Sequence, residues 1–204
     1  MKRFQEKSKI KEVKINEKGV SLIEVLVAVA IFGITIGAIS GIFISAIRTQ
    51  GRILATQELL DQTSYALEYM GRALRMARKD KTASCLTTCG AGCNYENPAG
   101  NLSGIRFINY DGKCQEFLKD GIQLKERKSS DDTAANLPSS GMSLTSDKLQ
   151  INSIKFNLSG QSQTDLLQPR VTIYLEILGR EAAGSRPKIQ IQTSISQRPL
   201  DVIQ

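Results

Sequence analysis

Apolar residues fill the chain from Val25 to Ile47, and no charged side chain interrupts them. A helix needs about 20 predominantly apolar residues to cross the hydrocarbon core of a bilayer. This segment has that length, so it predicts a membrane-spanning helix. Glu24 stands immediately before it, at the edge of the membrane or just inside it, where an unpaired carboxylate is costly.

The helical pattern continues past Arg48, but from there only one face of the helix is apolar. Apolar residues recur at helical spacing at Leu60, Leu67, Met70, Leu74 and Ala77. The pattern predicts one continuous helix from about Val20 to about Lys79, on the order of 90 Å long at 1.5 Å per residue. We expect residues 20–47 to be surrounded by lipid or protein, and residues 48–80 to lie against a soluble domain.

The remaining segment, 81–204, is rich in short runs with strand character. A hairpin is predicted around the turn dipeptide Asp111-Gly112, between Ile105–Tyr110 and Cys114–Leu118. Further strands are expected at Ile122–Glu126, Leu149–Leu158, Val171–Leu178 and Ile189–Ile195, with a polar loop at Lys128–Ser146. The last two strands alternate apolar and polar residues, so they should be antiparallel and half-buried, with the amphipathic half of the helix covering their apolar face. The predicted fold class is α+β, a long N-terminal helix packed on a C-terminal antiparallel β-sheet.

Charge is unevenly distributed along the chain. The formal net charge is +7, and the N-terminal leader, 1–19, has seven basic residues against three acidic ones. Basic residues that flank a membrane span stay in the cytoplasm, so the N-terminus should be inside and the remainder outside. The apolar segment is longer than that of a secretory signal and no Ala-x-Ala-like site follows it, so we expect it to remain in the mature protein.

The four cysteines, Cys85, Cys89, Cys93 and Cys114, all lie in the part assigned to the outside. An even number of cysteines in an oxidising compartment predicts two disulfides, and three pairings are open. The alternative is a zinc site with four thiolate ligands. The spacing C-x3-C-x3-C differs from the usual C-x2-C, and the chain has no histidine, so disulfides are favoured and no metal is expected.

The start of the apolar segment resembles the processing site of type IV prepilins and of the pseudopilins of type II secretion. The residues that carry the resemblance are Gly19, Val20, Leu22, Ile23, Glu24, Val25, Leu26, Val27 and Ala28, behind a basic leader. The resemblance implies a pilin-like fold, cleavage after Gly19 by a prepilin peptidase, and methylation of the new amino terminus at Val20. Glycine also suits the cleavage point physically, since it has no side chain to obstruct an extended backbone in a protease site.

Two further features of the helix concern assembly. Glu24 lies about one turn from Val20, where its carboxylate is better placed to meet the amine of an adjacent subunit than the amine of its own chain. The attraction between the two charges would be screened only weakly in hydrocarbon. The resemblance implies that such pairing registers the subunits. Gly33, Gly37 and Gly41 recur at every fourth residue, as in small-xxx-small helix contacts. The glycines could also loosen the helix locally, or simply be tolerated, as glycine is in membrane helices generally.

The preferred hypothesis is a minor type IV pilin-like subunit. In the family that the chain resembles, major type IV pilins commonly carry a cysteine pair near the C-terminus, whereas here the cysteines directly follow the helix. The alternative is a minor pseudopilin of a type II secretion system. Implied partners are the prepilin peptidase, other pilin or pseudopilin subunits, an assembly platform membrane protein, and lipid before assembly. The implied location is the cytoplasmic (inner) membrane as a single-pass protein, and then an extracytoplasmic or cell-surface filament.

Other classes of function receive less support from the sequence. A membrane-tethered adhesive or DNA-binding domain would use the basic residues of the helix, namely Arg48, Arg52, Arg72, Arg75 and Arg78. Such a series is usually the solvated face of a helix. No catalytic residues and no cofactor are expected, since the chain has no histidine and no nucleophile elbow. Asp131, Asp132 and Asp147 lack the spacing of a calcium-binding EF-hand and fit a solvated loop better.

Overall fold

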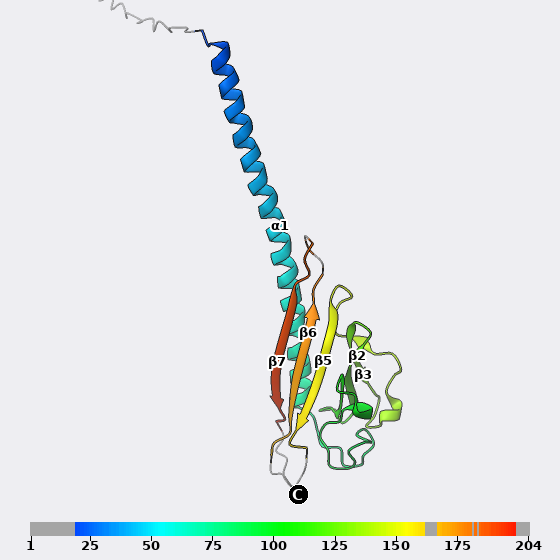
Figure 1. The fold of residues 1–204 in the computed structure, drawn as a ribbon. Coiled ribbons are helices and arrows are strands. Elements are labelled where there is room, and N and C mark those ends of the chain that lie inside the picture. The colour runs from blue at the N-terminus through cyan, green and yellow to red at the C-terminus, as the bar shows by residue number, and fades with distance from the viewer. Residues whose placement is uncertain (1–18, 162–166, 181, 183, 199–204) are drawn as a thin grey trace, which may run out of the picture. The chain divides into compact units, whose positions relative to one another are not determined.

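The computed structural model describes residues 19–161, 167–180, 182 and 184–198. The basic leader, apart from Gly19, lies outside the described residues. Two compact units divide the chain, Met1–Ala46 and Ile47–Gln204. Helix α1 (Leu22–Arg75) contributes its first part to one unit and its second part to the other (Figure 1).

Helix α1 is continuous over 54 residues, as the sequence predicted, and it ends at Arg75 rather than near Lys79. Hydrogen bonds from outside the helix to its last carbonyl groups explain why it ends at Arg75. The hydroxyl of Tyr95 donates a hydrogen bond of 2.7 Å to the carbonyl of Leu74. The backbone N–H of Arg198 donates one of 2.8 Å to the carbonyl of Arg75. Groups from distant parts of the chain thus satisfy the carbonyls that a longer helix would have bonded itself.

Among the described residues, seven strands follow α1, and every paired neighbour is antiparallel. The first sheet has the order β1-β2-β3-β4 and consists of β1 (Gly104–Ile108), β2 (Cys114–Asp120), β3 (Gln123–Lys128) and β4 (Met142–Ser143). The second has the order β5-β6-β7 and consists of β5 (Gln150–Ser159), β6 (Arg170–Leu178) and β7 (Lys188–Ser196). The predicted hairpin is β1-β2, with Gly112 at φ 79° in its turn. Two short 3₁₀ helices, Pro98–Gly100 and Ala134–Asn136, lie in the connections.

The strands form two sheets, whereas the sequence suggested one. The separation lies at the outer edge of β5, where single loop carbonyls take the place of a strand. The N–H of Ile151 donates to the carbonyl of Ile122 at 2.7 Å, and the N–H of Phe156 donates to that of Leu102 at 2.8 Å. Isolated bonds of this kind hold the first sheet against β5 without making a continuous ladder.

The second part of α1 covers the β5-β6-β7 sheet, and one hydrophobic core lies between them. The buried face of the helix consists of Ala55, Leu59, Thr63, Ala66, Met70, Gly71 and Leu74. Buried partners from the sheet include Phe156, Val171, Ile173, Ile177 and Ile195. The predicted cover is confirmed, but Leu60 is 44% exposed and its neighbour Leu59 is fully buried. At about 100° per residue, Leu59 lies about 20° from Met70 around the helix and Leu60 about 80° from it, on the far side of Leu74.

Candidate functional site

The backbone changes from irregular to helical after Ser21. Gly19 and Val20 precede α1 and are exposed, with Val20 at 67%. The helix begins at Leu22, where the carbonyl of Ser21 accepts hydrogen bonds from the N–H groups of Glu24 at 3.0 Å and of Val25 at 3.3 Å. The peptide bond between Gly19 and Val20 therefore lies outside the helix. A peptidase that binds extended backbone could reach it without unwinding α1.

Glu24 lies in the first turn of α1 with its side chain exposed. Its carboxylate has no ion-pair partner among the described residues. Together with Ile23, Val27, Ala28 and Ile31 it lines a shallow hollow on one side of the helix. A negative charge at a helix N-terminus is favourable. In a bilayer, however, this carboxylate would need a cation to compensate for its removal from water.

The first part of α1, residues 22–46, exposes apolar side chains on every face. The large ones include Leu26, Ile31, Phe32, Ile34, Ile39 and Phe43, each at least 59% exposed. At 1.5 Å per residue the segment is about 37 Å long, enough to cross a hydrocarbon core of about 30 Å. The helix thus has the length and composition of a membrane span, and it lies near the N-terminus.

The hydroxyl groups of Thr35 and Ser40, in this segment, are satisfied within the helix. Thr35 donates from its Oγ1 to the carbonyl of Ile31 at 2.5 Å, and Ser40 donates from its Oγ to the carbonyl of Ile36 at 2.8 Å. In hydrocarbon each unsatisfied polar group is costly. These internal hydrogen bonds make the segment compatible with lipid on all sides.

Gly33, Gly37 and Gly41 lie at helical positions in this exposed segment. A Cβ placed on any of them would meet no atom within 4 Å. No contact inside the chain therefore requires glycine at these positions. The close approach of a second helix at this face stays a prediction.

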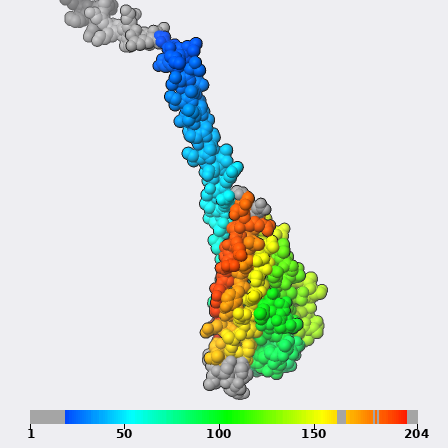
Figure 2. Space-filling view, in the orientation of Figure 1, coloured from blue at the N-terminus to red at the C-terminus, as the bar shows by residue number. Residues whose placement is uncertain are grey.

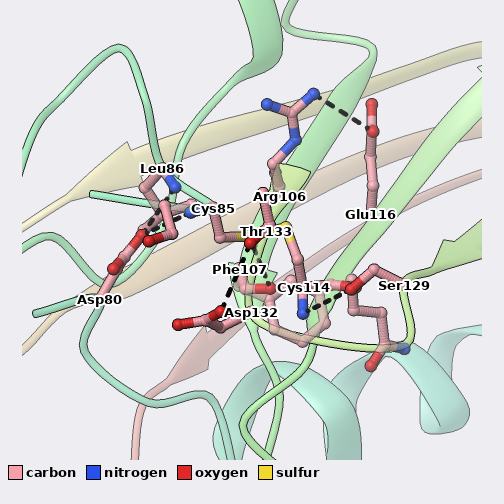
Figure 3. Close-up of a disulfide and its surroundings, with 12 residues drawn as sticks. Asp80, Cys85, Leu86, Arg106, Phe107, Cys114, Glu116, Ser129, Asp132 and Thr133 are labelled. Carbon is pink, nitrogen blue, oxygen red and sulfur yellow. Dashed lines mark hydrogen bonds and ion pairs between the residues drawn. A yellow bond between two sulfur atoms is a disulfide. The ribbon is translucent and has the colours of Figure 1, made fainter. Parts of the chain in front are cut away.

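The structure selects one of the three disulfide pairings, Cys85–Cys114 and Cys89–Cys93. The first joins the segment after α1 to the start of β2 across 29 residues, with its Cα atoms 5.5 Å apart (Figure 3). Cys85 and Cys114 are fully buried and pack with Leu86 and Ile108 in a second, smaller core. The second disulfide closes a short loop, with its Cα atoms 6.3 Å apart.

Asp80 organises the segment that holds these disulfides, although it is not among the residues selected from the sequence. It is 2% exposed, and one carboxylate oxygen accepts hydrogen bonds from the N–H groups of Cys85 at 2.9 Å and Leu86 at 2.8 Å (Figure 3). The other carboxylate oxygen accepts hydrogen bonds from the N–H and the hydroxyl of Thr82. Burial opposes ionisation, but these hydrogen bonds outweigh it and hold the pKa of Asp80 below its ordinary value. The Asp-x-Thr spacing of an Asx turn is the signal that could have indicated it.

The arginines proposed for DNA binding are all exposed, and they lie on or just after α1. Arg72 forms an ion pair with Glu68, one helical turn earlier. The N–H of Arg78 donates to the carbonyl of Ile108 at 2.8 Å, which ties the backbone there to β1. An ion pair within the series reduces the positive charge available to phosphate.

The aspartates considered for calcium do not come together. Asp131 accepts hydrogen bonds from the N–H of Thr133 at 3.0 Å and from the side-chain amide of Asn136 at 2.6 Å. Asp132 lies beside it, with the hydroxyl of Thr133 at 3.5 Å. Within the described ranges, no three histidine, cysteine, aspartate or glutamate side chains are grouped so that they could hold a metal ion.

Comparison with known proteins identifies the segment around Gly19 and Glu24. The family model of the prokaryotic N-terminal methylation motif matches residues 14–47. The chain therefore carries the signature of type IV prepilins and pseudopilins at the start of α1. No curated protein and no solved structure shows significant similarity to the chain. The match covers Gly19, Val20, Glu24 and the apolar part of α1, and the β-rich region lies beyond it.

Proposed function

We propose that this chain is the precursor of a minor pilin-like subunit, which a prepilin peptidase cleaves after Gly19 and which then assembles through α1 into a filament. The observation that carries the proposal is the order of features within one short segment. An exposed, non-helical Gly19–Val20 bond is followed by an unpaired carboxylate in the first helical turn and by an uncharged, predominantly apolar stretch of helix. The N-terminal methylation motif covers this same segment.

Cleavage creates the cation that Glu24 lacks. The new amino terminus at Val20 is positively charged, and methylation at this amine keeps the charge. Within one chain the amine and the carboxylate are held about one helical turn apart. An adjacent subunit displaced along the filament axis brings its own amine to Glu24 instead. Because hydrocarbon screens charge weakly, this pairing stabilises one register between subunits over the others.

The apolar helix supplies the other part of the assembly energy. Before assembly its exposed side chains contact lipid, and in a filament they contact the helices of neighbouring subunits. Lipid is as apolar as these side chains, so close packing rather than the hydrophobic effect drives the exchange. Gly33, Gly37 and Gly41 present a face without side chains, on which a second helix approaches closely.

Cleavage is tested by expressing the full chain with a prepilin peptidase and measuring its intact mass. The chain should lose about 2 kDa, the mass of a basic leader of this length. Gly19→Leu should abolish the loss, because a large side chain obstructs the extended backbone at the cleavage point. Gly41→Leu, within the helix, is the matched control and should be cleaved normally. An unshortened wild-type chain would contradict the proposal.

The role of Glu24 is tested in cells that hold the complete assembly machinery. Glu24→Gln should insert into the membrane and be cleaved, since it removes only the charge, yet its incorporation into sheared filaments should fall by about tenfold or more, equivalent to about 1.4 kcal/mol. Asp61→Asn, an exposed position on the second part of α1, is the control and should be incorporated normally. Normal incorporation of Glu24→Gln would exclude the assigned role.

A minor pseudopilin of a type II secretion system is the second candidate, because the motif at residues 14–47 is common to prepilins and pseudopilins. Both functions use the same cleavage and the same pairing of Glu24. Deleting the chain separates them. Loss of surface filaments with normal protein export supports the pilus, and loss of export supports the secretion system.

A further inference from the structure

Strand β7 is the outermost strand of its sheet and pairs on one side only. Its nine residues, Lys188–Ser196, are in register with β6 along their whole length, without a bulge. Figure 1 shows β7 at the border of the β5-β6-β7 sheet, and Figure 2 shows its orange-red surface along the same border of the domain. No other described segment makes a backbone hydrogen bond to its free side.

The other long strands at sheet borders are protected. The outer side of β1 exchanges hydrogen bonds with Glu96, at 2.8 and 3.0 Å, and receives one from the N–H of Arg78. The outer side of β5 bonds to the carbonyls of Leu102 and Ile122. Strand β4 has only two residues. Natural proteins shorten, bend or cover border strands because open ones recruit other chains. Among the described strands, β7 is long, regular and uncovered.

The pairing pattern shows which backbone groups are available on β7. The N–H of Gln197 donates to the carbonyl of Pro169, and the N–H of Gly179 donates to that of Pro187. In an antiparallel pair, residues alternate between bonding their partner strand and facing away from it. In this register Gln190, Gln192, Ser194 and Ser196 therefore direct their N–H and C=O groups away from β6.

A hollow runs beside this edge, between β7 and the second part of α1. Leu67 and Gly71 of the helix and Ile191 and Ile195 of the strand supply its apolar surface, and Arg72 and Arg75 also line it. Because residue 71 is glycine, no side chain from this position of the helix fills the hollow. A Cβ there would already lie 3.7 Å from Cδ1 of Ile195. An added strand would thus find backbone partners at the edge and space for apolar side chains beneath it.

The charges in and beside the hollow indicate what kind of strand fits. Arg72 is paired with Glu68, whereas the guanidinium of Arg75 has no ion-pair partner among the described residues. Strand β7 contains Lys188 and no acidic residue. A second copy of β7 would therefore bring no carboxylate to Arg75. A different segment with an acidic residue matches the hollow better.

We propose that the open edge of β7 binds an extended segment of another polypeptide, which adds a fourth strand to the β5-β6-β7 sheet. Every second residue of this segment is apolar and faces the hollow, and a carboxylate at one end pairs with Arg75. Backbone hydrogen bonds provide the affinity, and the alternate side chains provide the specificity. The proposal does not depend on cleavage at Gly19 or on the role of Glu24.

The test uses the full chain in detergent micelles and a capped, fluorescent peptide of the sequence Thr-Val-Thr-Val-Thr-Val-Thr-Glu as the probe. Binding is followed by fluorescence anisotropy, and amide hydrogen exchange reports where the peptide binds. The peptide should slow exchange at Gln190, Gln192 and Ser194, the amides that face away from β6. The same peptide N-methylated at alternate residues on its bonding edge, and the same peptide with lysine in place of glutamate, should each bind at least about tenfold more weakly.

Substitutions in β7 complete the test. Gln192→Pro removes an outward N–H and no bond to β6, so it should leave the thermal midpoint nearly unchanged and weaken peptide binding by about tenfold or more. Gln192→Thr, which keeps the N–H, is the matched control and should bind normally. Equal binding by Gln192→Pro, absence of peptide binding, or absence of protection at the alternate amides would overturn the proposal. Self-association that Gln192→Pro abolishes would assign the edge to a second copy and overturn it as well.

Discussion

The hydroxyl of Tyr95 donates a hydrogen bond of 2.7 Å to the carbonyl of Leu74, in the last turn of α1. Both side chains are buried, with Tyr95 at 1% and Leu74 at 0% exposure. Burial raises the pKa of Tyr95 above its ordinary value, so the hydroxyl stays protonated and can donate at neutral pH. The bond connects the end of the helix to the loop that leads into β1.

Removal of this hydroxyl should destabilise the domain. Tyr95→Phe keeps the ring but leaves the buried carbonyl of Leu74 without this donor, so the free energy of unfolding should fall by about 1–3 kcal/mol. Tyr110→Phe is the matched control, since Tyr110 is 56% exposed, and it should change the free energy little. Chemical denaturation of the full chain in detergent micelles measures both. An unchanged value for Tyr95→Phe would show that the bond contributes nothing to stability.

The buried carboxylate of Asp80 should make stability depend on acid. Its pKa is lower in the folded protein than the reference value of 3.8, because hydrogen bonds from Leu86, Cys85 and Thr82 outweigh the effect of burial. Its contribution is therefore fully present above about pH 5 and is lost as the pH falls through the lowered pKa. Asp80→Asn should lower the free energy of unfolding by about 1.5–3 kcal/mol at pH 7, the range for hydrogen bonds to a charged group.

The pH dependence separates this electrostatic effect from a simple packing defect. The difference between wild type and Asp80→Asn should be nearly constant between pH 6 and pH 8 and should shrink below about pH 4. Asp132→Asn, at an exposed loop position, should follow the wild-type curve. Denaturation curves at several pH values measure this. A difference that stays the same down to pH 2 would mean that the charge of Asp80 is irrelevant.

The two disulfides should contribute unequally to stability. Cys85–Cys114 closes a loop with a sequence separation of 29 and Cys89–Cys93 one of 4. In the chain-entropy account, the longer loop is worth about 3.5 kcal/mol and the shorter about 2 kcal/mol. The buried position of Cys85 and Cys114 adds a packing cost when serine replaces them.

The matched experiment replaces each pair with serine. The Cys85→Ser/Cys114→Ser double variant should lower the free energy of unfolding by more than the Cys89→Ser/Cys93→Ser double variant does. Denaturation of oxidised wild type and both variants under the same conditions gives the order. Mass spectrometry of proteolytic fragments tests the pairing itself, and a peptide that links Cys85 to Cys89 or Cys93 would disprove it.

Gly71 should tolerate alanine and reject a large side chain. A Cβ at this position would lie 3.7 Å from Cδ1 of Ile195, an ordinary contact distance. Alanine also favours the helix over glycine, so Gly71→Ala should raise the free energy of unfolding by up to about 1 kcal/mol. Gly71→Leu should lower it by about 1–3 kcal/mol, because the larger side chain must displace β7. Thermal melts of the two variants measure the effect. An unchanged stability of Gly71→Leu would show that β7 can move aside at little cost in free energy.

The elements of this fold could be predicted because their signals are local. The uncharged run from Val25 to Ile47 can be recognised as a membrane-length helix without knowledge of its tertiary contacts. Alternation of apolar and polar residues along Val171–Leu178 likewise identified β6 nearly to its ends. The processing motif is likewise a short contiguous pattern, which is why Gly19, Val20 and Glu24 could be selected and why a family model matches there. Leu59 and Leu60 mark the limit of such patterns. Both fit a helical period, and only the sheet beneath decides which one is buried.

The sequence by itself thus determined the long helix, the positions of the described strands other than β4, which lies inside the expected loop Lys128–Ser146, and the segment that is expected to be cleaved. Each of these depends on residues within a few positions of one another. The tertiary structure alone decided that Cys85 pairs with Cys114, that the carboxylate of Asp80 lies among the N–H groups of the following loop, and that the outer edge of β7 stays open. Disulfide pairing and strand order depend on which backbone segments come close in space, and distance along the chain does not encode this.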